Sequence, residues 1–144
     1  MDKQSEIIDS LNQMLQGEHM AVDVFNIFIS KIEEEPIKKT LQEVQDNHRK
    51  NIDILAKYIQ ELGGQPNENL GFKGTMAESK LNMQLGSKVD ASRVVHEAIE
   101  GETKGINMSE KLVRGHLDDR SRDLAGLILQ QDRISLDQLR NLLH

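Results

Sequence analysis

"QGEHMAVDVF", residues 16–25, puts the carboxylate of Glu18 in the middle of the apolar face of a long predicted helix. Through residues 4–33, apolar side chains recur at alternating steps of three and four, the period of a helix in a bundle. The stripe that contains Glu18 consists otherwise of Ile8, Leu11, Leu15, Val22, Phe25, Ile29 and Ile32. A carboxylate on a buried face requires polar partners, which must come from elsewhere in the chain.

Three further helices are predicted, and each also carries polar residues near the middle of its apolar stripe. Residues 36–62 contain His48 and Asn51, residues 89–114 contain Glu102, and residues 119–143 contain Asp132 and Ser135. Pro36 suits the first turn of the second helix, and Asp90 is a candidate N-cap of the third. In the fourth helix Gln131 and Leu136 compete with Asp132 and Ser135 for the buried face, and both alternatives stay open.

The connection between the second and third helices indicates the topology. Gly63 and Gly64 predict the end of the second helix, and the linker 63–88 contains five glycines and one proline. A short helix is predicted within it at 76–85. These 26 residues can span up to about 86 Å, whereas the second helix is only about 40 Å long. We therefore predict one domain, residues 1–144, with hairpins 4–62 and 89–143 and an up-down-down-up order of helices.

The polar residues of the four helices are predicted to meet in one layer. In an antiparallel pair, residues equidistant from the turn lie at one level. Glu18 is matched in this way with His48 and Asn51 about a turn at 33–35, and Glu102 with Asp132 and Ser135 about a turn at 116–119. The hairpins also resemble copies, because adding 84 to each residue number converts Glu18 to Glu102, His48 to Asp132 and Asn51 to Ser135.

Composition argues against several classes of function. The formal net charge is −6 and no basic run stands out, so we expect no nucleic-acid partner. The chain has no cysteine, which excludes disulfides and thiolate metal sites. No apolar run reaches transmembrane length and the N-terminus has no signal-peptide core, so we expect no membrane partner and a cytoplasmic location.

A family resemblance supports the predicted bundle. "GEH" at 17–19 and "EGET" at 100–103 resemble the first- and third-helix motifs of rubrerythrin-type proteins. The stretch "YIQELGGQPNENLGFKGTMAESKLNMQL…EAIEGETKGINMSEKL" is more specifically similar to a bacterial ferritin-like family of unknown function. The resemblance implies an all-α, ferritin-like four-helix bundle with a long crossover between helices two and three. In that fold, a Glu from each of two helices and a Glu-x-x-His pair from each of the other two hold two metal ions.

The sequence departs from this di-metal pattern in helices two and four. "HRKN" pairs His48 with Asn51, whereas "QDNH" keeps the imidazole but replaces the acid with Gln45. In helix four the matching readings are "DRIS" and "LQQD", and neither completes the motif. The candidate metal ligands are thus Glu18, His48, Glu102 and Asp132, with Asn51 and Ser135 as polar neighbours. This set suits one divalent ion, Zn, Fe or Mn, better than two irons.

Three functions remain open at this point. The first is a small cytoplasmic protein that binds one divalent metal ion in a degenerate di-metal site. The second is a non-catalytic structural or interaction protein, expected as a homodimer, whose polar layer is a hydrogen-bonded network without metal. The third, implied by the resemblance, is a di-iron oxidase or peroxidase. We expect no appreciable turnover of that kind, and no catalytic residue is assigned.

Overall fold

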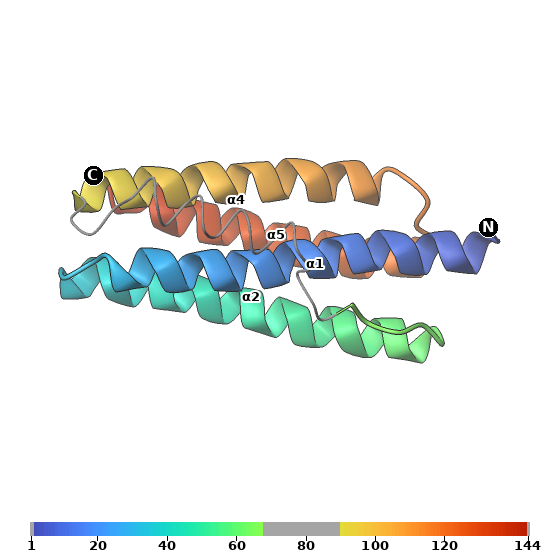
Figure 1. Cartoon of the computed structure of the whole chain (residues 1–144). Coiled ribbons are helices and arrows are strands. Elements are labelled where there is room, and N and C mark those ends of the chain that lie inside the picture. Colours follow the sequence, from blue (N-terminus) through green and yellow to red (C-terminus); the bar gives the residue numbers. More distant parts are fainter. Residues whose placement is uncertain (1, 68–89, 144) are drawn as a thin grey trace.

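The computed structural model describes residues 2–67 and 90–143, which form four long helices and no strand (Figure 1). The helices are α1 (Lys3–Ser30), α2 (Glu35–Glu61), α4 (Ala91–Val113) and α5 (Asp119–Asn141). Their ends lie within three residues of the predicted boundaries. The short helix predicted at 76–85 lies outside the described residues.

Side-chain caps explain where three of the helices begin. Asp2 accepts a hydrogen bond from the Ser5 amide (2.7 Å), and Asp118 accepts one from the Ser121 amide (3.0 Å). The predicted cap Asp90 accepts one from the Ser92 amide (3.3 Å) at the start of α4. These aspartates satisfy amides that have no partner within the helix and place negative charge at its positive end.

The turns between elements follow local sequence signals. Proline stands in the first turn of α2, as predicted for Pro36, and residues 31–34 connect the first hairpin. α1 ends at Ser30 and not at the predicted residue 33, because the last turn tightens: the Lys31 and Ile32 amides donate to carbonyls three residues back, those of Phe28 and Ile29. After α2, Gly63 has a φ of 84°, a left-handed conformation that glycine adopts without a steric penalty.

The helices are arranged in the predicted up-down-down-up order. α2 and α4 run in the same direction, opposite to α1 and α5, so the chain crosses the length of the bundle between α2 and α4 (Figure 1). α1 packs against α2 and α4, and α5 packs against the same two helices. Each helix is therefore antiparallel to its neighbours, and the parallel pairs lie on the diagonals. This arrangement points one face of every helix at a common axis.

The core consists of two large apolar clusters along this axis. One contains Ile7, Leu11, Met14, Leu15, Leu55, Tyr58, Ile59, Leu117, Ala125 and Ile128. The other contains Phe25, Phe28, Ile32, Leu41, Val44, Val94, Ala98 and Leu139. The buried polar residues of the predicted layer fall between them in the numbering of every helix. The apolar clusters thus enclose a polar layer near the middle of the bundle.

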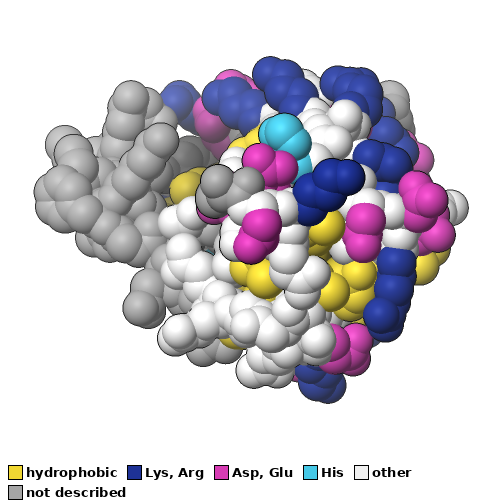
Figure 2. All heavy atoms as spheres, turned by 90° about the vertical axis from the view of Figure 1, so that its right-hand side faces the viewer, with side chains coloured by type: hydrophobic (Ala, Val, Ile, Leu, Met, Phe, Trp, Pro, Cys, Tyr) yellow, Lys and Arg dark blue, Asp and Glu magenta, His cyan; other side chains and the backbone are white. Residues whose placement is uncertain are grey.

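The outside of the bundle is charged. Viewed from the end where α1 begins, acidic and basic side chains lie mainly along the upper and right-hand parts of the described surface, with hydrophobic side chains among them (Figure 2). Among the described residues, no helix is both long enough and apolar enough to cross a bilayer. The pattern is that of amphipathic helices with their charged faces in water.

Candidate metal centre

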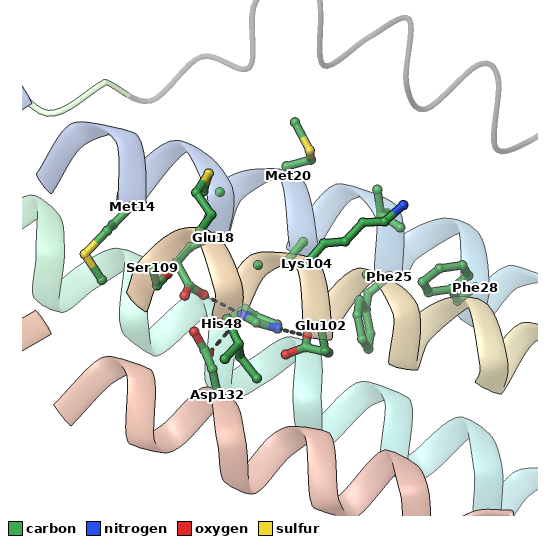
Figure 3. A pocket seen from close by; sticks show the side chains of 17 residues that line it. Met14, Glu18, Met20, Phe25, Phe28, His48, Glu102, Lys104, Ser109 and Asp132 are labelled. Carbon is green, nitrogen blue, oxygen red and sulfur yellow. Dashed lines mark hydrogen bonds and ion pairs between the residues drawn. The ribbon is translucent and has the colours of Figure 1, made fainter. Parts of the chain in front are cut away.

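His48 of α2 lies at the centre of the polar layer and links two other helices. Its Nδ1 forms a hydrogen bond with Glu18 of α1, and its Nε2 forms one with Glu102 of α4 (Figure 3). Asp132 of α5 approaches from a third side, with its Oδ1 3.6 Å from Nδ1. All four residues are at most 5% exposed. The structure therefore brings the four predicted ligands together, one from each helix.

The two predicted polar neighbours have different roles. Asn51 donates its amide hydrogens to Asp132 (3.1 Å) and to Glu18 (3.4 Å), so it belongs to the layer. Ser135 is buried, but its hydroxyl accepts a hydrogen bond from Asn47 (3.5 Å) instead. The layer consequently contains three carboxyl groups, one imidazole and one amide, with Ser135 at its edge.

The structure also decides between the alternatives left open by the sequence. Gln45 is buried, but it donates to the Val22 carbonyl (2.9 Å) and to Asn26 (2.7 Å), so it is not bonded to the carboxylate layer. The helix-two site is therefore "HRKN" and not "QDNH". In α5, Asp132 faces the layer, whereas Leu136 is buried in a separate apolar cluster with Ile106 and Leu129.

Glu102 is not placed as the other two acids are. Glu18 and Asp132 approach the same ring nitrogen of His48, whereas Glu102 binds the opposite nitrogen. One ligand atom from each of Glu18, His48 and Asp132 lies within 4.8 Å of the others, a separation that one metal ion can bridge. An ion on Nδ1 and an ion near Glu102 would lie on opposite sides of the ring, so Glu102 does not fit the same site.

The layer is enclosed by apolar groups on one side and adjoins a cavity on another. The Phe25 ring packs edge-on against His48, with 5.8 Å between ring centroids. A cavity of about 290 Å³ lies between α1 and α4 and reaches Glu18, His48, Glu102 and Asp132. The helical periodicity did not predict this cavity, although the glycines within "EGETKG", residues 100–105, are a local signal for it.

Two opposing effects act on the pKa of His48. Burial disfavours the imidazolium, but hydrogen bonds to Glu102 and Glu18 and the negative charges of both glutamates favour it. The second group of effects prevails and raises the pKa of His48 well above its usual range. In the metal-free protein, His48 is thus an imidazolium that donates both N–H groups to carboxylates.

The pKa of Asp132 is raised, whereas that of an ordinary ion-paired aspartate is lowered. Burial disfavours its charged form, and the nearby negative charge of Glu18 disfavours it further. Although the positive charge of His48 acts against this, the pKa of Asp132 rises to about 9. Without metal, therefore, Asp132 is neutral at pH 7.

These pKa shifts predict that the metal-free protein loses stability as the pH rises from 7 to 9. Both folded-state pKa values exceed the unfolded values, so the folded chain holds more protons and its stabilisation is lost on deprotonation. Each group contributes at most about 1.4 kcal/mol per pH unit to the decrease in unfolding free energy. Urea unfolding in chelator at several pH values measures the slope, and Asp132→Asn should reduce it. Equal stability at pH 7 and 9 would contradict the assigned protonation states.

Comparison with known protein families and structures places the chain among ferritin-like bundles. Residues 6–115 match the model of a family described as a domain of unknown function (DUF2383). Two solved structures are similar over nearly the whole chain, and both confirm the ferritin-like four-helix fold. A comparison with curated protein sequences finds no match.

The first structure is the bacterioferritin-related protein from Bacteroides fragilis, described as a dodecameric thioferritin. It is 20% identical, has a TM-score of 0.71, and the alignment covers 99% of this chain and 86% of that chain. The second is a conserved hypothetical protein from Mycobacterium tuberculosis, 17% identical with a TM-score of 0.72, aligned over 96% of this chain and 97% of that chain. Identities this low show a shared fold and leave the chemistry to be argued from the site.

Proposed function

We propose that this chain, which belongs to the DUF2383 family, binds one divalent metal ion through Glu18, His48 and Asp132. The observation that carries the proposal is the convergence of one ligand atom from each of these residues within 4.8 Å. The three side chains come from three different helices and are almost fully buried. Bound metal would also neutralise carboxylates that otherwise have few hydrogen-bond donors.

The remaining polar residues fit supporting roles around such an ion. With metal on Nδ1, the Nε2–H of His48 donates to Glu102, the arrangement that commonly orients a metal-binding histidine. Asn51 already lies against Glu18 and Asp132. Rotating its amide by 180° would direct the carbonyl oxygen at the ion as a fourth ligand. We therefore assign Glu102 to positioning and Asn51 to weak ligation.

The chemistry of the ligands limits the choice of ion. Two carboxylates, an imidazole and an amide oxygen are nitrogen and oxygen donors, which Zn, Fe and Mn all accept. A second ion would need further carboxylates, and the layer offers only Glu102, which is already bound to His48. For this reason we propose binding of a single ion and not di-iron oxidase or peroxidase chemistry.

Thermal unfolding of chelator-treated protein tests this function. Excess Zn(II), Mn(II) or Fe(II) should raise the melting temperature, because an ion that binds only the folded state stabilises it by about 2.7 kcal/mol at a hundredfold excess over Kd. Asp132→Asn should reduce the shift strongly. The control His96→Ala removes an exposed histidine from the same bundle and should leave it unchanged.

The alternative is a hydrogen-bonded network with no metal, and the bonds of His48 to both glutamates favour it. In that case none of the three ions would change the melting temperature of protein verified to be metal-free. The polar layer would then serve to set the register of the helices. That result would remove the metal-binding function and leave a structural one.

We also propose that the protein is cytoplasmic and self-associates, with a homodimer as the expected unit. Three large apolar side chains on α2 and α5 support self-association: Ile54 is 46% exposed, Leu127 69% and Ile134 49%. Where such residues form one contiguous patch, they mark a surface that another protein covers. The similar thioferritin is itself described as dodecameric. Sedimentation equilibrium of the full chain would distinguish a monomer from a dimer or a larger assembly.

A further inference from the structure

The cavity between α1 and α4 combines an apolar wall with an acidic floor (Figure 3). Its volume of about 290 Å³ is close to the lower limit for small-molecule sites, roughly 300 Å³. The wall is formed largely by Met20, Val24, Phe28, Ile106 and Met108. At the inner end lie the side chains of the polar layer. A ligand that fills this space must therefore be small and apolar over most of its length.

Three glycines line this space. Gly101 and Gly105 lie one helical turn apart on α4 and line the cavity, and a Cβ atom added at either would meet nothing within 4 Å. Gly17 lines it from α1, where the Met108 methyl group lies 3.0 Å from the position of an added Cβ. Side chains at 101 and 105 would thus project into open space, whereas Met108 closes the wall beside Gly17.

The charges of the cavity favour a cation at its inner end. Its floor contains the carboxyl groups of Glu18, Glu102 and Asp132 against a single imidazole, that of His48. Lys104 is the other basic residue among those lining the cavity, and its Nζ is paired with Glu100 at 3.0 Å. A bound carboxylate or phosphate would meet a surplus of acidic groups, so the floor selects against anions.

From this combination we infer that the cavity binds a small primary amine with an unbranched apolar body. The ammonium group points at the carboxylate of Glu18 and at the carbonyl oxygen of Asp132, which accepts a hydrogen bond even when that carboxyl group is protonated. The hydrocarbon part lies between α1 and α4. An ammonium has three hydrogen-bond donors and no acceptor, which matches a floor rich in carboxylate oxygens. A buried charge also needs such partners to offset its loss of water. This inference goes beyond metal binding, and the amine and a metal ion would compete for the same oxygens.

Calorimetric titration of the chelator-treated full chain at pH 7 tests the inference. Methylammonium, butylammonium and hexylammonium chlorides serve as probes, with butanoate and butanol as matched controls. Affinity should rise from methylammonium to butylammonium by up to about fourfold for each buried methylene. Butanoate and butanol should bind at least about tenfold more weakly than butylammonium, because one carries the wrong charge and the other none. No amine binding, equal binding of butanoate, or affinity independent of chain length would overturn the inference.

A pair of glycine variants locates the site. Gly105→Leu should occupy the cavity and weaken butylammonium binding at least about tenfold. Gly126→Leu is the control, because Gly126 is also a helical glycine with nothing within 4 Å of an added Cβ but does not line the cavity. Both changes raise helix propensity alike, so a difference in butylammonium affinity between the two variants is due to the cavity. Unchanged butylammonium binding by Gly105→Leu would contradict the assigned location.

Metal-induced shifts of the melting temperature and butylammonium binding, both measured on the same chelator-treated protein, distinguish the amine site from the metal site. If Zn(II), Mn(II) or Fe(II) raises the melting temperature and butylammonium does not bind, the amine site is wrong and the metal site stands. If butylammonium binds and no ion shifts the melting temperature, the metal site is wrong and the amine site stands. When both the amine and a metal ion bind, each should weaken the apparent affinity of the other. Independent binding would show that they do not share the same carboxylate oxygens.

Discussion

Replacing His48 with alanine is expected to destabilise the metal-free protein by about 3–5 kcal/mol at pH 7, the usual result of removing one partner from a buried ion cluster. His48 provides hydrogen bonds to both Glu18 and Glu102, and it is the only basic side chain described in contact with the layer. Without it, three buried carboxyl groups share only the amide of Asn51. Urea unfolding in chelator measures the loss.

Two variants establish the cause of that loss. His96→Ala should change the unfolding free energy by less than about 0.5 kcal/mol, because His96 is exposed on α4. Combining His48→Leu with Glu18→Leu and Glu102→Leu should recover most of the stability, since an apolar replacement leaves fewer charges unpaired. A loss below about 1 kcal/mol in His48→Ala would show that the imidazole does not hold the layer together.

Metal affinity is expected to rise about a hundredfold per pH unit between pH 6 and 7. In the metal-free protein, the pKa values of His48 and Asp132 are both raised, that of Asp132 to about 9, so both groups are protonated in this range. Both must deprotonate to act as ligands, which releases two protons for each bound ion, and each contributes tenfold per pH unit. The direction follows from the sign of the shifts: lower pH favours the proton-bound, metal-free state.

Calorimetry in two buffers of different ionisation enthalpy counts the released protons directly. Asp132→Asn should bind metal more weakly and release one proton, so its affinity should change by only about tenfold per pH unit. His96→Ala should release two protons, as the unaltered chain does. An affinity that is constant between pH 6 and 7 would contradict the proposed exchange of protons for metal.

The residues of the polar layer can be predicted from the sequence because two features determine them, the helical period and the distance from each turn. The helical period assigns Glu18, His48, Glu102 and Asp132 to the inner faces of four helices. Equal distance from each turn then sets them at one level. The long linker makes the second and fourth helices, α2 and α5, antiparallel neighbours. These arguments use only spacing along the chain, and the structure agrees with them.

The roles within the layer depend on contacts that spacing does not specify. Spacing assigns Glu102 and Asp132 to the same level as His48. The orientation of the imidazole in the structure then gives Nε2 to Glu102 and leaves Nδ1 facing Glu18 and Asp132. The amphipathic pattern of α5 likewise allows either Asp132 or Leu136 at the centre, whereas the structure puts Asp132 in the layer and Leu136 in a separate apolar cluster. Rotation of the helix about its axis selects one of them.

The chain spacing established a four-helix bundle with a carboxylate and histidine layer, since helical period and hairpin register are properties of the sequence alone. The distance between α1 and α4 is not determined by spacing along the chain, because it results from the packing of all four helices at once. The cavity that reaches the layer lies between these two helices and is lined in part by Gly101 and Gly105. Only the tertiary structure therefore shows that the buried acids can meet a ligand.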